Sequence, residues 1–344
     1  MWITLETRRL NEEELNTAVA ILKADGLVAF PTETVYGLGA NALSEKAVKR
    51  VFAVKGRPTD NPLIVHITGF NQVKTYVDNI HPLAEQLTEK YWPGPLTLVC
   101  QTKKDAFPAV VSAGLPTVSF RMPNNDKTLA LLNASCLPLV GPSANTSGKP
   151  SPTSSEHVYH DLNGKIEGIL EDGSTAIGVE STVLDISDPN QPPMILRPGA
   201  ITKEQLEHDL GIEIAVDKHL IKESEAPKSP GMKYKHYSPD TKVIMIRKNN
   251  WEKAVATAQQ QALKVGVMAG PTIVSQVQQN VTTVFTFADD SVEAATKGLF
   301  AGLRALDESA PKLDVIYVVT FPEKDLGVAY MNRLKKAAAQ QYFE

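Results

Sequence analysis

A proline- and glycine-punctuated basic segment interrupts this chain about two thirds of the way along. It contains EAPKSPGMKYKHYSPD, has little hydrophobic periodicity and falls within residues 212–240. Clustered proline and glycine end regular elements, so such a segment is typical of a linker between domains. At 344 residues the chain also exceeds the size at which single hydrophobic cores stop growing. The sequence therefore predicts two domains, residues 1–211 and 241–344, joined by the linker 212–240.

The first predicted domain mixes apolar strand-like runs with amphipathic helices in no strict order. The run LVAF follows a helix predicted over residues 11–23, and LIVHI follows a second helix that opens on the capping residue Ser44 and stops at Gly56. Further strands are predicted at PLTLVC, TVSFRM, LPLVG, STVLDI and MILRPG. This irregular order favours an α/β domain with a twisted mixed sheet and flanking helices.

The second predicted domain has a regular pattern. Its short apolar runs VIMI, VGVMA, VTTVFTF and VIYVVTF alternate with helical stretches such as NNWEKAVATAQQQALK. Parallel neighbouring strands need crossover connections, which are usually helices. Strict alternation therefore predicts a small, Rossmann-like α/β domain with a parallel sheet.

Charge and cysteine content exclude several classes of protein. The formal net charge is -4, so binding of nucleic acid or phosphate must rest on a local patch. Cys100 and Cys136 lie in apolar runs typical of small buried side chains, so neither a disulfide framework nor a zinc site is predicted. The N-terminus is too charged for a signal peptide, and no run reaches the length of a membrane span. We therefore expect a cytoplasmic protein with no membrane partner.

Four predicted strands lead into polar elements, which are PTET after LVAF, Arg121 in TVSFRM, PSAN after LPLVG and Arg197 in MILRPG. Open sheets bind ligands at the carboxyl ends of strands. An arginine is seldom buried without an anionic partner, and no run of acids supplies one here. We therefore favour an anionic ligand, with backbone or single-carboxylate partners for the two arginines as the alternative.

Two glycine-containing stretches resemble nucleotide-binding motifs only loosely. Residues 37–42, GLGANA, are parted from the preceding strand by five residues, and GPSANTSGK has Pro150 where a metal-binding hydroxyl should follow. A triphosphate nevertheless suits the cations Lys55 and Arg57. Mg²⁺ that arrives with ATP keeps mostly phosphate and water ligands, so we predict no protein metal site and expect Mg²⁺ bound mainly through ATP phosphates.

Eight motifs in order carry a family resemblance, namely FPTETVYGLGA, KGRPTDNPLIVHI, WPGPLT, RMP, PSANTSG, GVESTV, LRPG and SPGMKYKHYSP. Together they resemble the YrdC-type family, and the appended domain resembles that of its long two-domain form, the threonylcarbamoyl-AMP synthases. The resemblance implies an enzyme that joins L-threonine, bicarbonate and ATP into L-threonylcarbamoyladenylate and releases pyrophosphate. The product would pass to a tRNA threonylcarbamoyl-transfer complex, and direct contact with tRNA would not be required.

The resemblance also assigns site residues. The family's Lys-x-Arg and Ser-x-Asn pattern is matched by four residues that would bind ATP and support catalysis, Lys55, Arg57, Ser143 and Asn145. The other ATP-binding positions would be Asn61, Thr117, Ser151, Arg197 and Tyr234. Threonine would be bound by Thr34, His66, Arg121 and Ser181, with Arg121 taking its carboxylate. The linker sequence KYKHY would close over the nucleotide as a lid.

Two other functions are compatible with the same residues. A non-catalytic RNA-binding module would use the basic cavity for phosphate backbones, but the -4 charge and the lack of interleaved aromatic and basic residues outside the linker weigh against it. A carbamoyl-transfer domain would belong to a larger maturation enzyme, and this chain lacks the accompanying zinc-finger segment. The synthase is therefore our first hypothesis.

Overall fold

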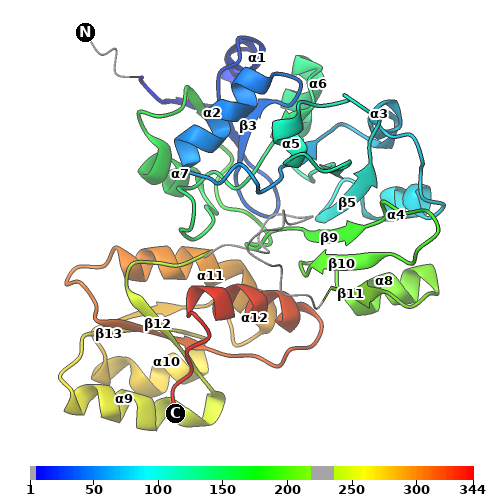
Figure 1. The fold of residues 1–344 in the computed structure, drawn as a ribbon. Coiled ribbons are helices and arrows are strands. Elements are labelled where there is room, and N and C mark those ends of the chain that lie inside the picture. Colours follow the sequence, from blue (N-terminus) through cyan, green and yellow to red (C-terminus); the bar gives the residue numbers. More distant parts are fainter. Residues whose placement is uncertain (1–4, 218–235) are drawn as a thin grey trace. The chain divides into compact units, whose positions relative to one another are not determined.

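The computed structural model describes residues 5–217 and 236–344, and the chain divides into two compact units (Figure 1). The first unit holds most of the chain before the undescribed segment. Among the described residues, the second unit holds 236–344 together with two short segments, 148–151 and 177–179. Most of the predicted linker lies outside the described residues, so its role and its limits stay predictions.

The first unit is built on an eleven-stranded mixed sheet in the order β1-β8-β2-β3-β7-β4-β6-β5-β9-β10-β11. Its strands are β1 (Arg8–Leu10), β2 (Val28–Phe30), β3 (Gly37–Asn41), β4 (Ile64–His66), β5 (Leu96–Gln101), β6 (Thr117–Arg121), β7 (Leu139–Val140), β8 (Gly168–Leu170), β9 (Thr182–Asp185), β10 (Met194–Arg197) and β11 (Ala215–Val216). The sheet contains both parallel pairs, such as β4 with β6, and antiparallel pairs, such as β5 with β6. The predicted mixed sheet is confirmed.

Helices cover both faces of this sheet, as the burial of β2 shows. Ala29 belongs to one buried apolar cluster, while Val28 and Phe30 belong to another. Successive side chains of a strand point to opposite faces, so both faces are packed. The helices of this unit are α1 (Leu15–Lys23), α2 (Glu45–Lys55), α3 (Phe70–Tyr76), α4 (Ala84–Tyr91), α5 (Ala109–Ser112), α6 (Asp126–Ser135), α7 (Ser155–Leu162) and α8 (Lys203–Leu210).

The second unit carries a four-stranded, all-parallel sheet in the order β12-β15-β13-β14, which confirms the predicted fold. Its elements are β12 (Lys242–Ile246), α9 (Trp251–Gln260), β13 (Val265–Ala269), α10 (Pro271–Val277), β14 (Thr283–Thr286), α11 (Val292–Asp307), β15 (Val315–Val319) and α12 (Leu326–Ala337). Helices α9 and α10 lie on one face of the sheet, and α11 and α12 lie on the other (Figure 1). All four strands therefore present their carboxyl ends at the same edge.

One strand was missed by the sequence analysis, and one prediction about a cysteine needs correction. The glycine stretch at residues 37–41 forms strand β3, because the Phe30 ring lies against it: a Cβ at Gly37 would come within 2.8 Å of the Phe30 ring. Packing therefore requires glycine here. Because strands are usually recognised by β-branched residues, a strand rich in glycine was not predicted. Cys100 is buried as expected, but Cys136 is exposed and ends α6 in a left-handed conformation.

Candidate active site

Lys55 ends α2 and brings two predicted segments together. The helix starts at the cap Ser44, whose side chain accepts a hydrogen bond from Ala47 N, and it stops at Gly56 with φ of 62°. The Lys55 side chain does not point into solvent as a capping cation would, because the residue is only 2% exposed. Its Nζ donates to the carbonyl oxygens of Ser143 and Asn145, the latter at 2.6 Å. The ammonium group thus anchors the loop that carries the Ser-x-Asn pattern.

Arg57 shapes the turn that follows. Its Nε donates to Asn61 O at 3.3 Å and its Nη2 donates to Pro62 O at 3.0 Å. The Asn61 side chain is 2% exposed, and its Oδ1 has no hydrogen-bond partner in the described part of the chain. The turn therefore places an unused amide oxygen directly before β4.

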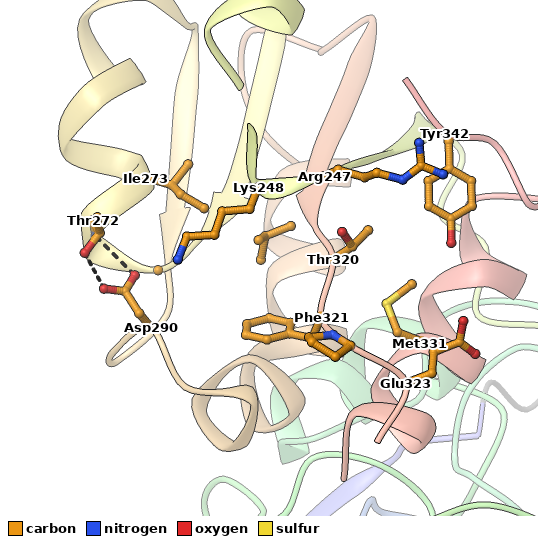
Figure 2. Close-up of a pocket in the computed structure, with 13 residues that line it drawn as sticks. Arg247, Lys248, Thr272, Ile273, Asp290, Thr320, Phe321, Glu323, Met331 and Tyr342 are labelled. Carbon is orange, nitrogen blue, oxygen red and sulfur yellow. Dashed lines mark hydrogen bonds between the residues drawn. The ribbon is translucent and has the colours of Figure 1, made fainter. Parts of the chain in front are cut away.

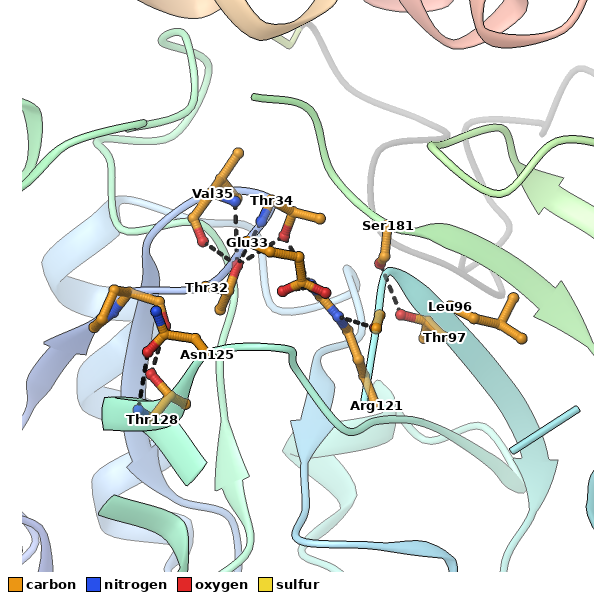
Figure 3. A network of polar contacts seen from close by, with 12 residues as sticks. Thr32, Glu33, Thr34, Val35, Leu96, Thr97, Arg121, Asn125, Thr128 and Ser181 are labelled. Carbon is orange, nitrogen blue, oxygen red and sulfur yellow. Dashed lines mark hydrogen bonds and ion pairs between the residues drawn. The ribbon is translucent and has the colours of Figure 1, made fainter. Parts of the chain in front are cut away.

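Arg121 has the carboxylate partner that the sequence did not reveal (Figure 3). Its Nη2 lies 2.6 Å from Glu33 Oε2, and both side chains are nearly fully buried. Its Nη1 donates to Thr34 Oγ1 at 2.8 Å, and its Nε donates to Gly94 O at 3.2 Å. Glu33 is the single-carboxylate partner that the sequence analysis kept as the alternative to an anionic ligand. Glu33 lies in the PTET motif. A single acid directly after a buried strand was the sequence signal that could have identified it as the partner of Arg121.

Arg197 also has partners within the protein, as the alternative interpretation expected. Its Nε and Nη2 donate to Ser181 O at 3.1 and 3.0 Å, and its Nη2 also donates to Ser181 Oγ at 3.1 Å. Ser181 Oγ in turn shares a hydrogen bond of 2.8 Å with Thr97 Oγ1 (Figure 3). Backbone and hydroxyl oxygens can therefore stabilise a buried guanidinium in this unit. This contact also joins a residue predicted to bind ATP to one predicted to bind threonine.

Strands β4 and β6 carry the predicted residues at opposite ends. At their carboxyl ends His66 lies opposite Arg121 in the register. At the amino end of β4, Gly141 N donates to Ile64 O at 2.9 Å, so the loop with Ser143 starts there. Ile64 and His66 are two residues apart, which is about 7 Å along a strand. The His66 ring nevertheless lies against Gly141, which opens that loop, so the two polar groups of residues are neighbours.

His66 is held neutral at the carboxyl end of β4. Burial and the nearby charge of Arg121 lower the pKa of His66 to about 3. Its ring meets the Phe30 ring edge-on with 5.1 Å between centroids, and a Cβ at Gly141 would come within 2.6 Å of His66 Nδ1. A neutral imidazole can accept or donate a hydrogen bond without adding charge.

Several buried polar atoms around these residues accept or donate no hydrogen bond within the described part of the chain. They are both carboxylate oxygens of Glu33, Asn61 Oδ1, His66 Nδ1 and Arg121 Nη2. The Arg121 and Glu33 atoms form an ion pair at 2.6 Å without the alignment of a hydrogen bond. Folded proteins satisfy nearly all buried polar groups, so such a concentration indicates a place for a polar ligand.

Three of the predicted residues lie elsewhere or outside the description. Thr117 opens β6, four residues before Arg121, and pairs with Gln101 of β5. Ser151 is buried, but it groups with the second unit. Tyr234 lies outside the described residues. For these positions the assignment to ATP stays a prediction.

Residues 5–217 and 236–344 contain no group of three or more His, Cys, Asp or Glu side chains placed to hold a metal ion. None of the described helices combines the length and apolar character needed to cross a membrane.

Comparison with known proteins gives matches over both units. The family model described as "Telomere recombination" matches residues 20–199, and the model described as "Threonylcarbamoyl-AMP synthase, C-terminal domain" matches residues 201–339. The threonylcarbamoyl-AMP synthase of Pyrococcus abyssi is 44% identical over 98% of each chain. That of Bacillus subtilis is 46% identical over 95% of this chain and 94% of its own. The crystal structure of Pyrococcus abyssi Sua5 complexed with L-threonine matches with a TM-score of 0.89 and 42% identity over 98% of both chains.

Proposed function

Because this chain belongs to the two-domain, Sua5-type family of threonylcarbamoyl-AMP synthases, we infer that it makes threonylcarbamoyl-AMP for the threonylcarbamoyladenosine modification of tRNA. The observation that carries this conclusion is the sequence identity of 44% and 46% to two such synthases, which extends over nearly the full length of the chain. The chain is thus an enzyme that uses ATP. Its proposed reaction joins L-threonine, bicarbonate and ATP and releases pyrophosphate.

We assign ATP to the amino end of β4. Lys55 fixes Ser143 and Asn145 through their carbonyl groups, and Arg57 fixes the turn that presents Asn61. These contacts support a rigid frame on which hydroxyl and amide groups meet a nucleotide with little reorganisation. The charge of Lys55 adds a fixed positive field near the phosphates.

We assign threonine to the carboxyl ends of β4 and β6. Arg121 Nη2 donates no hydrogen bond within the described part of the chain, so it can receive the carboxylate of threonine. The Glu33 carboxylate, whose oxygens accept no hydrogen bond within the described part of the chain, supplies the opposite charge for the amino group. Thr34, His66 and Ser181 would complete this end. A zwitterion thus meets a buried pair of opposite sign, which supports the assignment.

The proposed chemistry has two bond-forming steps. The neutral amine nitrogen of threonine first bonds to the carbon of carbon dioxide, giving a carbamate and a proton, or to the carbon of bicarbonate, giving a carbamate and water. A carbamate oxygen then attacks the α-phosphorus. The bond from that phosphorus to the bridging oxygen breaks, and pyrophosphate leaves with the electron pair. The His66 ring lies against Gly141, which opens the loop with Ser143, and this contact supports neighbouring positions for the two substrates.

Mg²⁺ is part of the proposal only as a companion of ATP. Mg²⁺ commonly keeps phosphate and water ligands and needs one or two protein groups at most, which fits the hydroxyl and amide character of this site. When bound, the ion would neutralise phosphate charge. The residues of the chain would orient the nucleotide around it.

Transfer of the product to a tRNA threonylcarbamoyl-transfer complex also belongs to the proposal. So does the cytoplasm, as the compartment where ATP and tRNA meet.

The deciding experiment measures pyrophosphate release by the purified protein while threonine and bicarbonate are omitted in turn. We expect turnover only with both, together with a product of the mass of threonylcarbamoyl-AMP. Release of pyrophosphate without threonine would contradict the proposed reaction.

A further inference from the structure

A cavity of about 670 Å³ opens at the carboxyl edge of the parallel sheet in the second unit (Figure 2). Residues that follow each of the four strands line it, including Arg247 after β12, Gly270 after β13, Asp290 after β14 and Thr320 after β15. Its size falls within the range of about 300–1,000 Å³ for small-molecule sites. Open parallel sheets bind their ligands at this edge. None of the residues already assigned to ATP or threonine lines this cavity.

Two cations stand at its rim. Arg247 and Lys248 are both exposed, and the Arg247 guanidinium lies 4.9 Å from the centre of the Tyr342 ring. Figure 2 shows Lys248 extended toward the side of the cavity where Thr272 and Asp290 lie, while Arg247 turns toward Tyr342. Lys248 forms no ion pair in the described part of the chain, so its charge is available to an anion.

A fixed acceptor lies on the same side. Asp290 accepts hydrogen bonds from Thr272 N at 3.2 Å and from Thr272 Oγ1. Gly270 makes room for it, because a Cβ there would come within 2.1 Å of Asp290 Oδ1. The carboxylate is therefore held in place beside the cavity, where it can accept hydrogen bonds from the hydroxyl groups of a ligand.

The rest of the lining favours a flat apolar body. Phe321, Pro322, Ile273 and Met331 supply carbon surface. The other acid of the lining, Glu323, is 2.5 Å from Lys335 Nζ, so its charge is neutralised within the protein. Asp290 offsets one of the two cations Arg247 and Lys248, so the lining keeps an excess of one positive charge, which attracts anions.

We propose that this cavity binds a nucleoside 5′-monophosphate, with the phosphate at Lys248 and Arg247, the ribose hydroxyls at Asp290 and the base against Phe321 and Met331. Inorganic phosphate would leave the apolar wall unused, and an uncharged apolar ligand would leave two cations unpaired. A dinucleotide is a poorer fit, because the turn after β12 reads RKNN and lacks the glycine fingerprint that receives a pyrophosphate.

The test uses the full chain labelled at its methionine methyl groups with carbon-13, because Met331 lines the cavity and reports binding there. The Met331 resonance is assigned with Met331→Leu, and AMP is titrated while the spectrum is recorded. We expect a saturable shift of this resonance. In Lys248→Ala the dissociation constant should rise about tenfold or more, since one charge-assisted hydrogen bond is lost.

One control variant and one variant of the ribose contact test whether AMP binds in this cavity as proposed. Lys264→Ala removes an exposed lysine directly before β13, at the opposite edge of the same sheet, and should leave the Met331 titration unchanged. Asp290→Asn should weaken AMP more than 2′,3′-dideoxy-AMP. An unmoved Met331 resonance at millimolar AMP would overturn the proposal, and so would adenosine binding as tightly as AMP. Either result can occur while pyrophosphate release from ATP stays normal.

Discussion

The two units place cations near strand ends in opposite environments. In the first unit Lys55, Arg121 and Arg197 are 2%, 4% and 5% exposed, and each donates to oxygen atoms of the protein. In the second unit Arg247 and Lys248 are exposed at the rim of a cavity. A buried cation that loses its partners destabilises the fold strongly, whereas a rim cation contributes little. The buried cations of the first unit therefore hold neighbouring residues in fixed positions. The exposed cations of the second unit keep their positive charge available for binding an anion.

The strongest test of this contrast is the Arg121–Glu33 pair. Arg121→Gln should lower the free energy of unfolding by about 3–5 kcal/mol, because Glu33 is left as a buried charge without its cation. Glu33→Gln should have a similar effect. The double variant should be less destabilised than the sum of the two, because neither charge is then unpaired. Urea unfolding of the four proteins measures this coupling, and additive effects would contradict the buried ion pair.

Lys55→Met should follow, with a loss of about 2–3 kcal/mol in stability, because the buried carbonyl groups of Ser143 and Asn145 lose a charged donor. Pyrophosphate release should fall by about a hundredfold as the loop moves. Lys49→Met is the matched control on the same helix, since Lys49 is exposed and pairs with Glu45 four residues away. Equal losses in the two variants would show that burial of Lys55 is unimportant.

The sequence predicted the elements more successfully than the partners within the site. Helix α2 was predictable from Ser44 and Gly56, because both caps are local signals. Strand β3 was not predictable, because its glycines are needed to make room for the Phe30 ring, and that contact arises only in the folded structure. The same limit applies to Arg121, whose partner Glu33 is 88 residues away in the chain. Motifs could name site residues, but only the fold shows which oxygen each cation reaches.

A smaller effect concerns pH and His66. Its pKa in the folded protein is about 3, below the ordinary value of 6.5, so the unfolded chain binds more protons between these values. Stability should therefore fall as the pH drops below about 6.5, by up to about 1.4 kcal/mol per pH unit from this residue. His66→Gln should show a shallower dependence than the parent between pH 7.5 and 5.5 in urea unfolding. Parallel curves would mean that His66 is not held neutral by burial.

The smallest effect should come from the second unit. Lys248→Ala removes an exposed rim cation, so we expect a change of less than about 0.5 kcal/mol in the free energy of unfolding and no change in pyrophosphate release. Thermal unfolding without ligand measures the first quantity, and steady-state assays measure the second. A loss as large as that of Lys55→Met would show that this lysine supports the fold. A small loss of stability would distinguish the buried cations, which stabilise the fold around a site, from the exposed cations, which are available to bind a ligand.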